Sequence, residues 1–86
     1  MIKAIEIYTT GTCPFCIRAK ALLDRKKVSY TEFRVDHTPA YVDEAVKRSG
    51  GRTTVPQIFI GEVHVGGCDE LYALEKEKKL DALLGL

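Results

Sequence analysis

Two cysteines separated by two residues, Cys13 and Cys16, are the side chains of this chain best suited to chemistry. Two thiols this close together can exchange electrons with another disulfide, or they can supply half of a metal site. In disulfide exchange the attacking species is the thiolate rather than the thiol. The position that best stabilises a negative sulfur therefore decides which of the two cysteines reacts first.

The pair lies where a predicted strand and a short loop give way to a predicted helix. This helix is expected from Pro14 to Lys26, because proline suits a first helical turn, where no amide hydrogen is needed. Unpaired amides and the positive end of the helix dipole stabilise an anion there. We therefore expect Cys13 to be the exposed nucleophile. Cys16 lies one turn further along the same helix face and is expected to be buried and to resolve a mixed disulfide.

A zinc site is the main alternative use of the pair. Cys68 and His64 would be its third and fourth ligands, with His37 in reserve. Structural zinc sites usually show a second closely spaced pair of ligands, which this sequence lacks, and His64 fits the surface side of a strand. A chance pair inside a helix is a further alternative, which the strand–loop–helix context disfavours. We expect no metal.

In the first predicted strand Ile5 and Ile7 flank a polar Glu6, the second is rich in β-branched and aromatic residues, and the third is a short apolar run. In the predicted helices apolar residues recur every third or fourth position. The strands are expected at residues 2–8, 28–35, 57–60 and 63–65, with a polar loop at 9–12 and a two-residue turn at 61–62. After the helix at 14–26, a second helix is expected to start at an N-cap, Thr38, and to stop at Gly50 and Gly51. Its buried residues would be Val42, Ala45 and Val46. The last helix carries Leu71 and Leu74, and a separate final turn is expected around Leu80, Leu83 and Leu84.

The order of these elements, β-α-β-α-β-β-α, predicts an α/β fold. A helix joins the first two strands, so they should be parallel with a right-handed crossover. The tight turn makes the last two strands antiparallel. The sequence therefore predicts a mixed four-stranded sheet flanked by helices.

Composition limits the chain to a small set of functions. Its 86 residues fit one domain, residues 1–86. Its 13 basic and 12 acidic residues do not supply the clustered cations that nucleic-acid binding needs. No apolar run is long enough to cross a bilayer, and the N-terminus lacks the features of a signal peptide, so a cytoplasmic protein is expected. Three cysteines, an odd number, do not suit a secreted disulfide scaffold.

Three separated motifs carry a resemblance to one family. The motifs are Thr12-Cys13-Pro14-Phe15-Cys16, Arg52-Thr53-Thr54-Val55-Pro56-Gln57 and Gly66-Gly67-Cys68-Asp69-Glu70-Leu71. A lone Cys-x-x-Cys would be a weak signal, whereas three motifs in this order and spacing are specific. The sequence resembles the glutaredoxins, in particular the short dithiol type of bacteria, and the similarity covers essentially the whole chain. The implied fold is the thioredoxin fold.

The resemblance implies a glutathione site beside the cysteines. In the family the peptide bond at Val55–Pro56 is cis, which lets the backbone of Val55 pair with glutathione as an added strand would. Helix-start amides and Asp69 would hold the γ-glutamyl end, although Asp69 also fits a simple N-cap. Arg52 would hold the glycine carboxylate, unless it is a solvated loop cation. The implied glutathione-binding residues are Thr12, Phe15, Arg52, Thr54, Val55, Pro56, Gly67, Cys68 and Asp69.

Two positions depart from the commonest family pattern. Thr10 stands where many members have lysine, and Phe15 stands where many have tyrosine. The first change removes a cation from the site and the second removes a hydroxyl. Neither blocks thiol chemistry, but both are expected to weaken glutathione binding.

The implied activity is glutathione-dependent thiol–disulfide exchange through Cys13 and Cys16. Glutathione would be the reducing co-substrate, and the enzyme would reduce protein disulfides and glutathione mixed disulfides. The expected partners are disulfide-containing or glutathionylated proteins, of which ribonucleotide reductase is one compatible case. A monomer is expected.

Two other functions stay open. One is a thioredoxin-like electron donor reduced by a flavoprotein, which the Gly67-Cys68-Asp69 motif disfavours. The other is a dimeric carrier of an iron–sulfur cluster held by Cys13 and glutathione. In the family, a proline directly after the nucleophile disfavours the cluster form, and Pro14 stands at that position.

Overall fold

The computed structural model describes residues 3–86. It contains the expected mixed four-stranded sheet, in the order β2-β1-β3-β4. β1 and β2 are parallel, and the other neighbouring pairs are antiparallel, as predicted from the connections. The elements are β1 (Ile5–Thr9), α1 (Pro14–Arg25), β2 (Thr31–Arg34), α2 (Ala40–Arg48), β3 (Gln57–Ile60), β4 (Val63–Gly66), α3 (Cys68–Lys76) and α4 (Leu80–Leu84).

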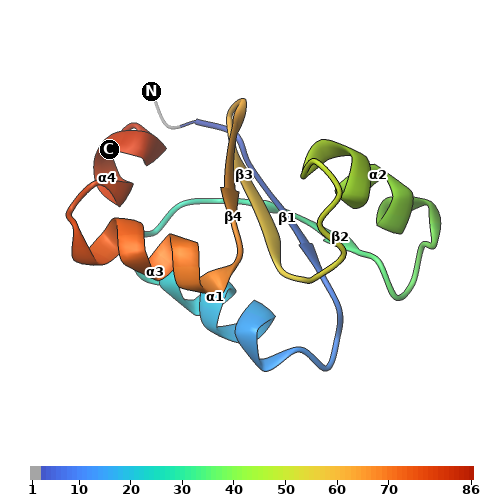
Figure 1. Cartoon of the computed structure of the whole chain (residues 1–86). Coiled ribbons are helices and arrows are strands. Elements are labelled where there is room, and N and C mark those ends of the chain that lie inside the picture. Colours follow the sequence, from blue (N-terminus) through green and yellow to red (C-terminus); the bar gives the residue numbers. More distant parts are fainter. Residues whose placement is uncertain (1–2) are drawn as a thin grey trace.

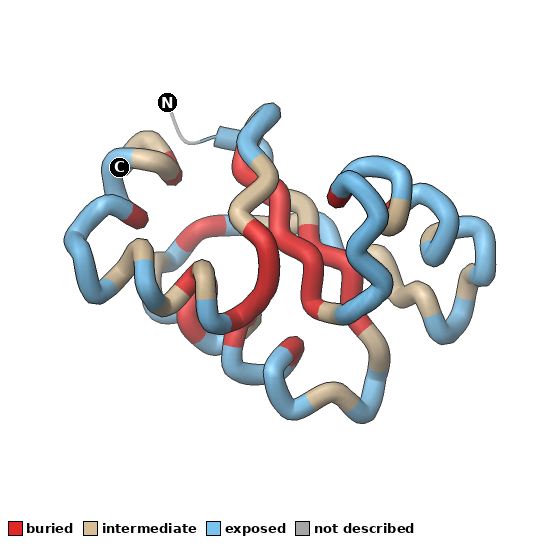
Figure 2. Tube along the Cα trace, viewed as in Figure 1, coloured by how far each residue is buried: buried red, intermediate tan, exposed pale blue. Residues whose placement is uncertain are grey.

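Helices cover both faces of the sheet (Figure 1). α1, α3 and α4 lie on the face that buries the isoleucines of β1 and β3, and this side holds the larger core. The buried positions are concentrated in the central strands of the sheet (Figure 2). Because side chains alternate along a strand, the opposite face carries Tyr8 and Phe59, which pack with Ala45 of α2. The main core residues on the first face are Ile5, Ile7, Leu22, Leu23, Ile58, Ile60, Leu71, Leu80 and Leu84.

A charged network fastens α2 to its face of the sheet. The guanidinium of Arg48 lies 4.1 Å from the ring centre of Phe59 and donates to the Tyr8 hydroxyl at 2.7 Å and to Glu6 at 2.9 Å. Burial raises the pKa of Tyr8 to about 12, and its hydroxyl donates to Glu44. These contacts set the position of α2 beside the loop that precedes β3.

Several predicted boundaries were wrong by one to three residues. Residue 2 lies outside the described residues, and Thr9 belongs to β1 rather than to the loop. α1 ends at Arg25, one residue early, because Lys26 forms its C-cap. β2 covers only Thr31–Arg34 of the predicted 28–35, since its pairing with β1 extends only over those residues. The turn at 61–62 and the separate last helix are confirmed.

The prediction for α2 needs two corrections. Thr38 is not the N-cap, because the helix begins at Ala40 and Pro39 precedes it without a side-chain cap. Of the predicted buried stripe only Ala45 is buried. Val42 is 44% exposed and Val46 is half-buried, so these two apolar side chains lie at the protein surface and are not buried against the sheet. No helix within residues 3–86 is long and apolar enough to span a membrane.

Candidate active site

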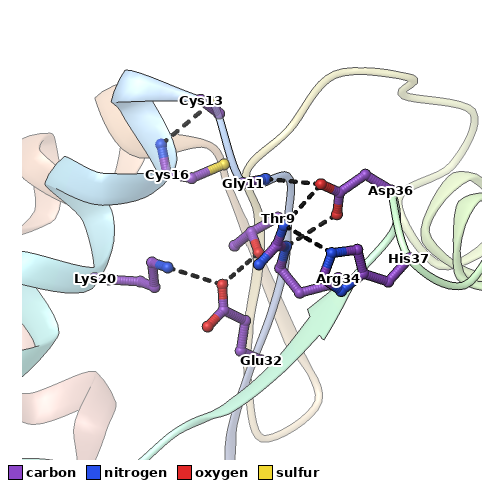
Figure 3. A network of polar contacts seen from close by, with 9 residues as sticks. All are labelled: Thr9, Gly11, Cys13, Cys16, Lys20, Glu32, Arg34, Asp36 and His37. Atoms are coloured by element: carbon purple, nitrogen blue, oxygen red, sulfur yellow. Dashed lines mark hydrogen bonds and ion pairs between the residues drawn. The ribbon is translucent and has the colours of Figure 1, made fainter.

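Cys13 is the N-cap of α1, as predicted. Its backbone is extended, with φ −91° and ψ 112°, and the N–H of Cys16 donates to its Sγ at 3.3 Å. Cys13 therefore sits at the positive end of the helix dipole with one amide already aimed at its sulfur. Figure 3 shows the two cysteines one turn apart, with this bond between them.

Cys16 is fully buried, whereas Cys13 is half-buried. Burial raises the pKa of the Cys16 thiol to about 12, and its hydrogen bond with Cys13 adds to the shift. Cys16 thus stays protonated while Cys13 meets solvent. The difference in burial is the one that the sequence predicts for a nucleophile and a resolving thiol.

The loop before β3 reaches across to the cysteines. Its Val55–Pro56 peptide bond is cis, as the resemblance implies. The Sγ of Cys13 donates to the carbonyl oxygen of Val55 at 3.7 Å, although the two residues are 42 positions apart in the chain. The reason is sheet pairing: β1 and β3 are antiparallel, so the segment that follows β1 meets the segment that precedes β3.

A hollow of about 250 Å³ opens beside this contact. Eight of the nine residues predicted to bind glutathione line it; Thr12 does not, and it lies exposed in the loop before Cys13. One further residue, Glu70, lines it without having been predicted. The predicted residues at the hollow are Phe15, Arg52, Thr54, Val55, Pro56, Gly67, Cys68 and Asp69.

Glu70 organises the charged side of the hollow. Gly67 is the N-cap of α3, and the carboxylate of Glu70, at N3, accepts from the Gly67 amide, as in one half of a capping box. The same carboxylate pairs with Arg52 at 2.9 Å. Burial alone raises the pKa of Glu70, but the bonds from Arg52 and the backbone amides outweigh it, and the net shift is downward.

These contacts bear on two alternatives left open by the sequence. Asp69 is not an N-cap, because Gly67 holds that position and Asp69 lies exposed in the first turn of α3. Arg52 is exposed in the loop, as a solvated cation would be, and its guanidinium pairs with Glu70. Burial raises the pKa of Cys68, which is buried at the start of the same helix.

The buried side-chain amide of Gln57, which the sequence motifs did not single out as functional, holds the loop before β3. Gln57 is fully buried, and its Nε2 donates to the Thr54 carbonyl at 2.9 Å and to the Thr54 hydroxyl at 3.3 Å. Its Oε1 lies 2.7 Å from Nε2 of His64, whose ring stacks on Phe59. This network assigns a proton to Nε2 of His64. The sequence signal for Gln57 was its place as a polar residue at the start of an otherwise apolar strand, directly after a proline.

A second network holds the loop that carries Cys13 (Figure 3). Asp36 accepts from the Gly11 amide at 3.0 Å and pairs with Arg34 at 2.7 Å. The bond from Arg34, followed by that from Gly11, holds the pKa of Asp36 well below its usual range. In the same view, Glu32 pairs with Lys20 of α1 at 2.8 Å.

The Asp36 contacts predict an acid-sensitive loop. A carboxyl whose folded pKa is depressed adds stability above its unfolded pKa of about 3.9 and loses it as pH falls toward the folded value. Asp36→Asn should therefore lower the urea midpoint at pH 7, and its difference from the wild type should shrink below about pH 4. Arg34→Gln removes the other partner and should behave alike. A difference that stays constant down to pH 2.5 would contradict this assignment.

The histidines named for the zinc alternative are engaged elsewhere. His64 contacts Gln57 and Phe59, and His37 lies 3.3 Å from the guanidinium of Arg34. Within residues 3–86, no three His, Cys, Asp or Glu side chains gather as a metal-binding group.

Fold and site together define a class of protein. A mixed sheet of this order, a Cys-x-x-Cys pair at the start of the first helix and a cis-proline loop facing it are the parts of a thioredoxin-fold thiol–disulfide oxidoreductase. Comparisons with known proteins narrow the class.

Residues 5–65 match the family model described as Glutaredoxin. The chain is 59% identical over 80 residues to glutaredoxin 3 of Escherichia coli (strain K12), which covers 93% of this chain and 95% of the relative. It is similar to the solution structure of glutaredoxin from Brucella melitensis, with 57% identity, a TM-score of 0.83, and coverage of 96% and 89%. It is also similar to a buckwheat glutaredoxin–glutathione complex, with 28% identity, a TM-score of 0.87, and coverage of 96% and 77%.

The chain belongs to the glutaredoxin family. It is accordingly a glutathione-dependent thiol–disulfide oxidoreductase with the thioredoxin fold, as the three sequence motifs predict.

Proposed function

We propose that Cys13 is the nucleophile of this enzyme and that Cys16 resolves its mixed disulfides. The Cys13 thiolate attacks one sulfur of a protein disulfide, which breaks; a bond to Cys13 forms, and the released sulfur takes a proton. Cys16 then attacks Cys13, closes the Cys13–Cys16 disulfide, and frees the second protein thiol. Two glutathione thiols return the pair to the dithiol and leave as glutathione disulfide.

A glutathionylated protein follows a shorter route. Cys13 attacks the glutathione sulfur, the protein thiol leaves, and Cys13 carries the glutathione. A second glutathione thiolate attacks that sulfur and restores Cys13, again giving glutathione disulfide. No step of this route uses Cys16, so the two routes can be separated by mutation.

Glutathione fits the hollow beside Cys13 by its charges. The backbone of Val55 suits the cysteine unit of glutathione, because its carbonyl oxygen lies 3.7 Å from Sγ of Cys13. The amide at the start of α3 and the exposed carboxylate of Asp69 suit the carboxylate and ammonium of the γ-glutamyl end. Arg52 suits the glycine carboxylate, which must then share the guanidinium with Glu70. Thr12 and Phe15 complete the proposed site, Thr12 from outside the hollow.

The observation that carries this proposal is the contact of Cys13 with the cis-proline loop at the mouth of the hollow. Its test is NADPH consumption with glutathione, glutathione reductase and the mixed disulfide of glutathione with 2-mercaptoethanol. Turnover should require glutathione. Turnover with thioredoxin reductase but none with glutathione would instead favour the thioredoxin-like donor.

Gln57 is proposed as a positioning residue for glutathione, because it holds Thr54 and hence the backbone of Val55. Gln57→Leu removes both bonds to Thr54 and should raise KM for the mixed disulfide roughly tenfold at nearly unchanged kcat. His64→Phe keeps a ring on Phe59 but removes the donor to Gln57, and a smaller rise in KM is expected. If the urea midpoint falls in both variants while KM stays constant, Gln57 is only structural.

The wider setting is proposed from the family. Residues 1–86 form one domain that acts as a monomer in the cytoplasm. Its protein substrates carry disulfides or bound glutathione, and ribonucleotide reductase is one of them. Reduction of oxidised ribonucleotide reductase by the purified enzyme and glutathione tests that partner directly.

A further inference from the structure

The resolving step of the proposed route requires a negative charge on a buried sulfur. Cys16 is fully buried, and burial raises the pKa of its thiol to about 12. Only the thiolate attacks a disulfide, and a thiol with this pKa is ionised at pH 7 in roughly one molecule in 10⁵. A bond to the substrate removes the Cys13 thiol, whose hydrogen bond adds to the shift, but the burial of Cys16 remains. A fixed positive charge beside Cys16 would therefore speed its attack.

Lys20 brings a positive charge to this position. It lies one turn beyond Cys16 in α1, and residues four apart share a helix face. Figure 3 shows both side chains projecting from the same side of the helix. The ammonium of Lys20 pairs with Glu32 of β2 at 2.8 Å, and Glu32 also accepts a hydrogen bond from the buried hydroxyl of Thr9 in β1. Contacts with two strands thus hold the charge of Lys20 on the Cys16 side of α1.

The charge of Lys20 acts on the Cys16 thiol itself. Burial is the largest effect on the pKa of Cys16 and raises it, whereas a hydrogen bond from the backbone of Thr10 and the charge of Lys20 lower it. Arg34 is a second cation of this network, but two hydrogen bonds commit its guanidinium to Asp36. Lys20 is therefore the side chain of this network best placed to stabilise a Cys16 thiolate. The other titratable or charged groups near the cysteine pair are Cys13, Glu32, Arg34, Asp36, His37 and Cys68.

We propose that Lys20 is a positioning residue for the resolving step, in which its fixed charge stabilises the Cys16 thiolate. The inference rests on the proposed function, which makes Cys16 the resolving thiol. In this step the Cys16 thiol gives its proton to water, and the thiolate attacks the sulfur of Cys13. The Cys13–Cys16 bond forms while the bond from Cys13 to the substrate sulfur breaks, and the substrate leaves as a thiolate that water protonates. Glu32 and Thr9 keep the Lys20 ammonium in place throughout.

The test follows the resolving step directly with dithiobis(nitrobenzoate), an aromatic disulfide that releases a coloured thiolate. With enzyme in excess, Cys13 releases one equivalent in a first phase, and Cys16 releases the second equivalent in a later phase. Lys20→Met should slow the second phase at pH 7 about three- to tenfold, because fewer Cys16 thiols ionise. The first phase should stay within about twofold, since Cys13 carries it out. Lys20→Arg retains the charge and should keep both phases within about twofold of the wild type.

Glu32→Gln separates the charge of Lys20 from the ion pair that Lys20 forms. It breaks the same pair but leaves the ammonium and removes a negative charge, so the second phase should be at least as fast as in the wild type. Equal slowing by Lys20→Met and Glu32→Gln would overturn the proposal, because the pair would then act only through structure. Lys26→Met is the matched control, since Lys26 lies at the far end of α1 and pairs with Glu75 at 2.7 Å. It should leave the second phase unchanged.

Cys16→Ala distinguishes a failure of this inference from a failure of the proposed function. It should lose the second phase and keep the first, and circular dichroism checks that each variant folds. A second phase that persists in Cys16→Ala, or is absent from the wild type, would overturn the proposed function and this inference with it. A second phase that needs Cys16 but is unchanged in Lys20→Met would reject the role of Lys20 and retain Cys16 as the resolving thiol.

Discussion

Cys13→Ser is expected to abolish both protein-disulfide reduction and release of bound glutathione. Cys13 is the only cysteine of the chain that is not buried, since Cys16 and Cys68 are 0% and 4% exposed. A serine hydroxyl does not ionise near neutral pH and cannot form the disulfide that both routes need. The loss in kcat/KM should exceed about 10³-fold in the coupled NADPH assay, leaving only direct exchange with glutathione.

This variant should keep its fold, which makes the result interpretable. Serine is among the best N-cap residues, so the start of α1 remains capped. A thermal midpoint within a few degrees of the wild type would serve as the control. Retention of even a tenth of the wild-type rate in a folded Cys13→Ser protein would show that another sulfur is the nucleophile.

Cys16→Ser is expected to separate the two routes. Reduction of a protein disulfide should fall by at least about 100-fold, because attack by a neighbouring thiol has an effective molarity far above millimolar glutathione. Turnover of the small mixed disulfide should remain within about threefold, since that route does not use Cys16. The comparison is made on one protein preparation with insulin and with the 2-mercaptoethanol mixed disulfide.

Burial of Cys16 calls for a second variant. A serine hydroxyl at this fully buried position is left short of partners and costs about 1–3 kcal/mol of stability. Cys16→Ala avoids the buried hydroxyl and should give the same separation of the routes. Equal losses on both substrates, in two variants that fold, would show that Cys16 has a role beyond resolving the disulfide.

Local signals were sufficient for the parts of the site that lie close together in the chain. Proline after Cys13 predicts the start of α1, and the three-residue spacing places Cys16 one turn in. Isoleucines on either side of a polar Glu6 predict β1, a short apolar run predicts β3, and Gly61 at φ +60° confirms the tight turn between the last strands. These features depend on neighbours within four residues, where backbone preferences and side-chain periodicity act directly.

The predictions were wrong where contacts with a distant segment of the chain set the end of a strand or the position of a helix. Thr9 continues β1 because Arg34, in β2, pairs with it, and nothing within a few residues of Thr9 shows that. Val42 has the spacing of a buried residue, but contacts of Arg48 with Tyr8 and Phe59 set how α2 lies on the sheet. Local periodicity predicts which residues share a face and not which of them reach the core.

By itself the sequence determined the order of the elements, the place of the cysteine pair at the start of the first helix and, through three motifs, the family. The resemblance already implied that Val55 lies beside the cysteines, whereas only the tertiary structure showed the pairing of Arg52 with Glu70 and the buried Gln57 behind Thr54. The physical reason is that the antiparallel pairing of β1 with β3, and the packing of α3 beside α1, join segments tens of residues apart. Contacts of that kind depend on how whole elements pack, which the spacing of residues along one segment does not determine.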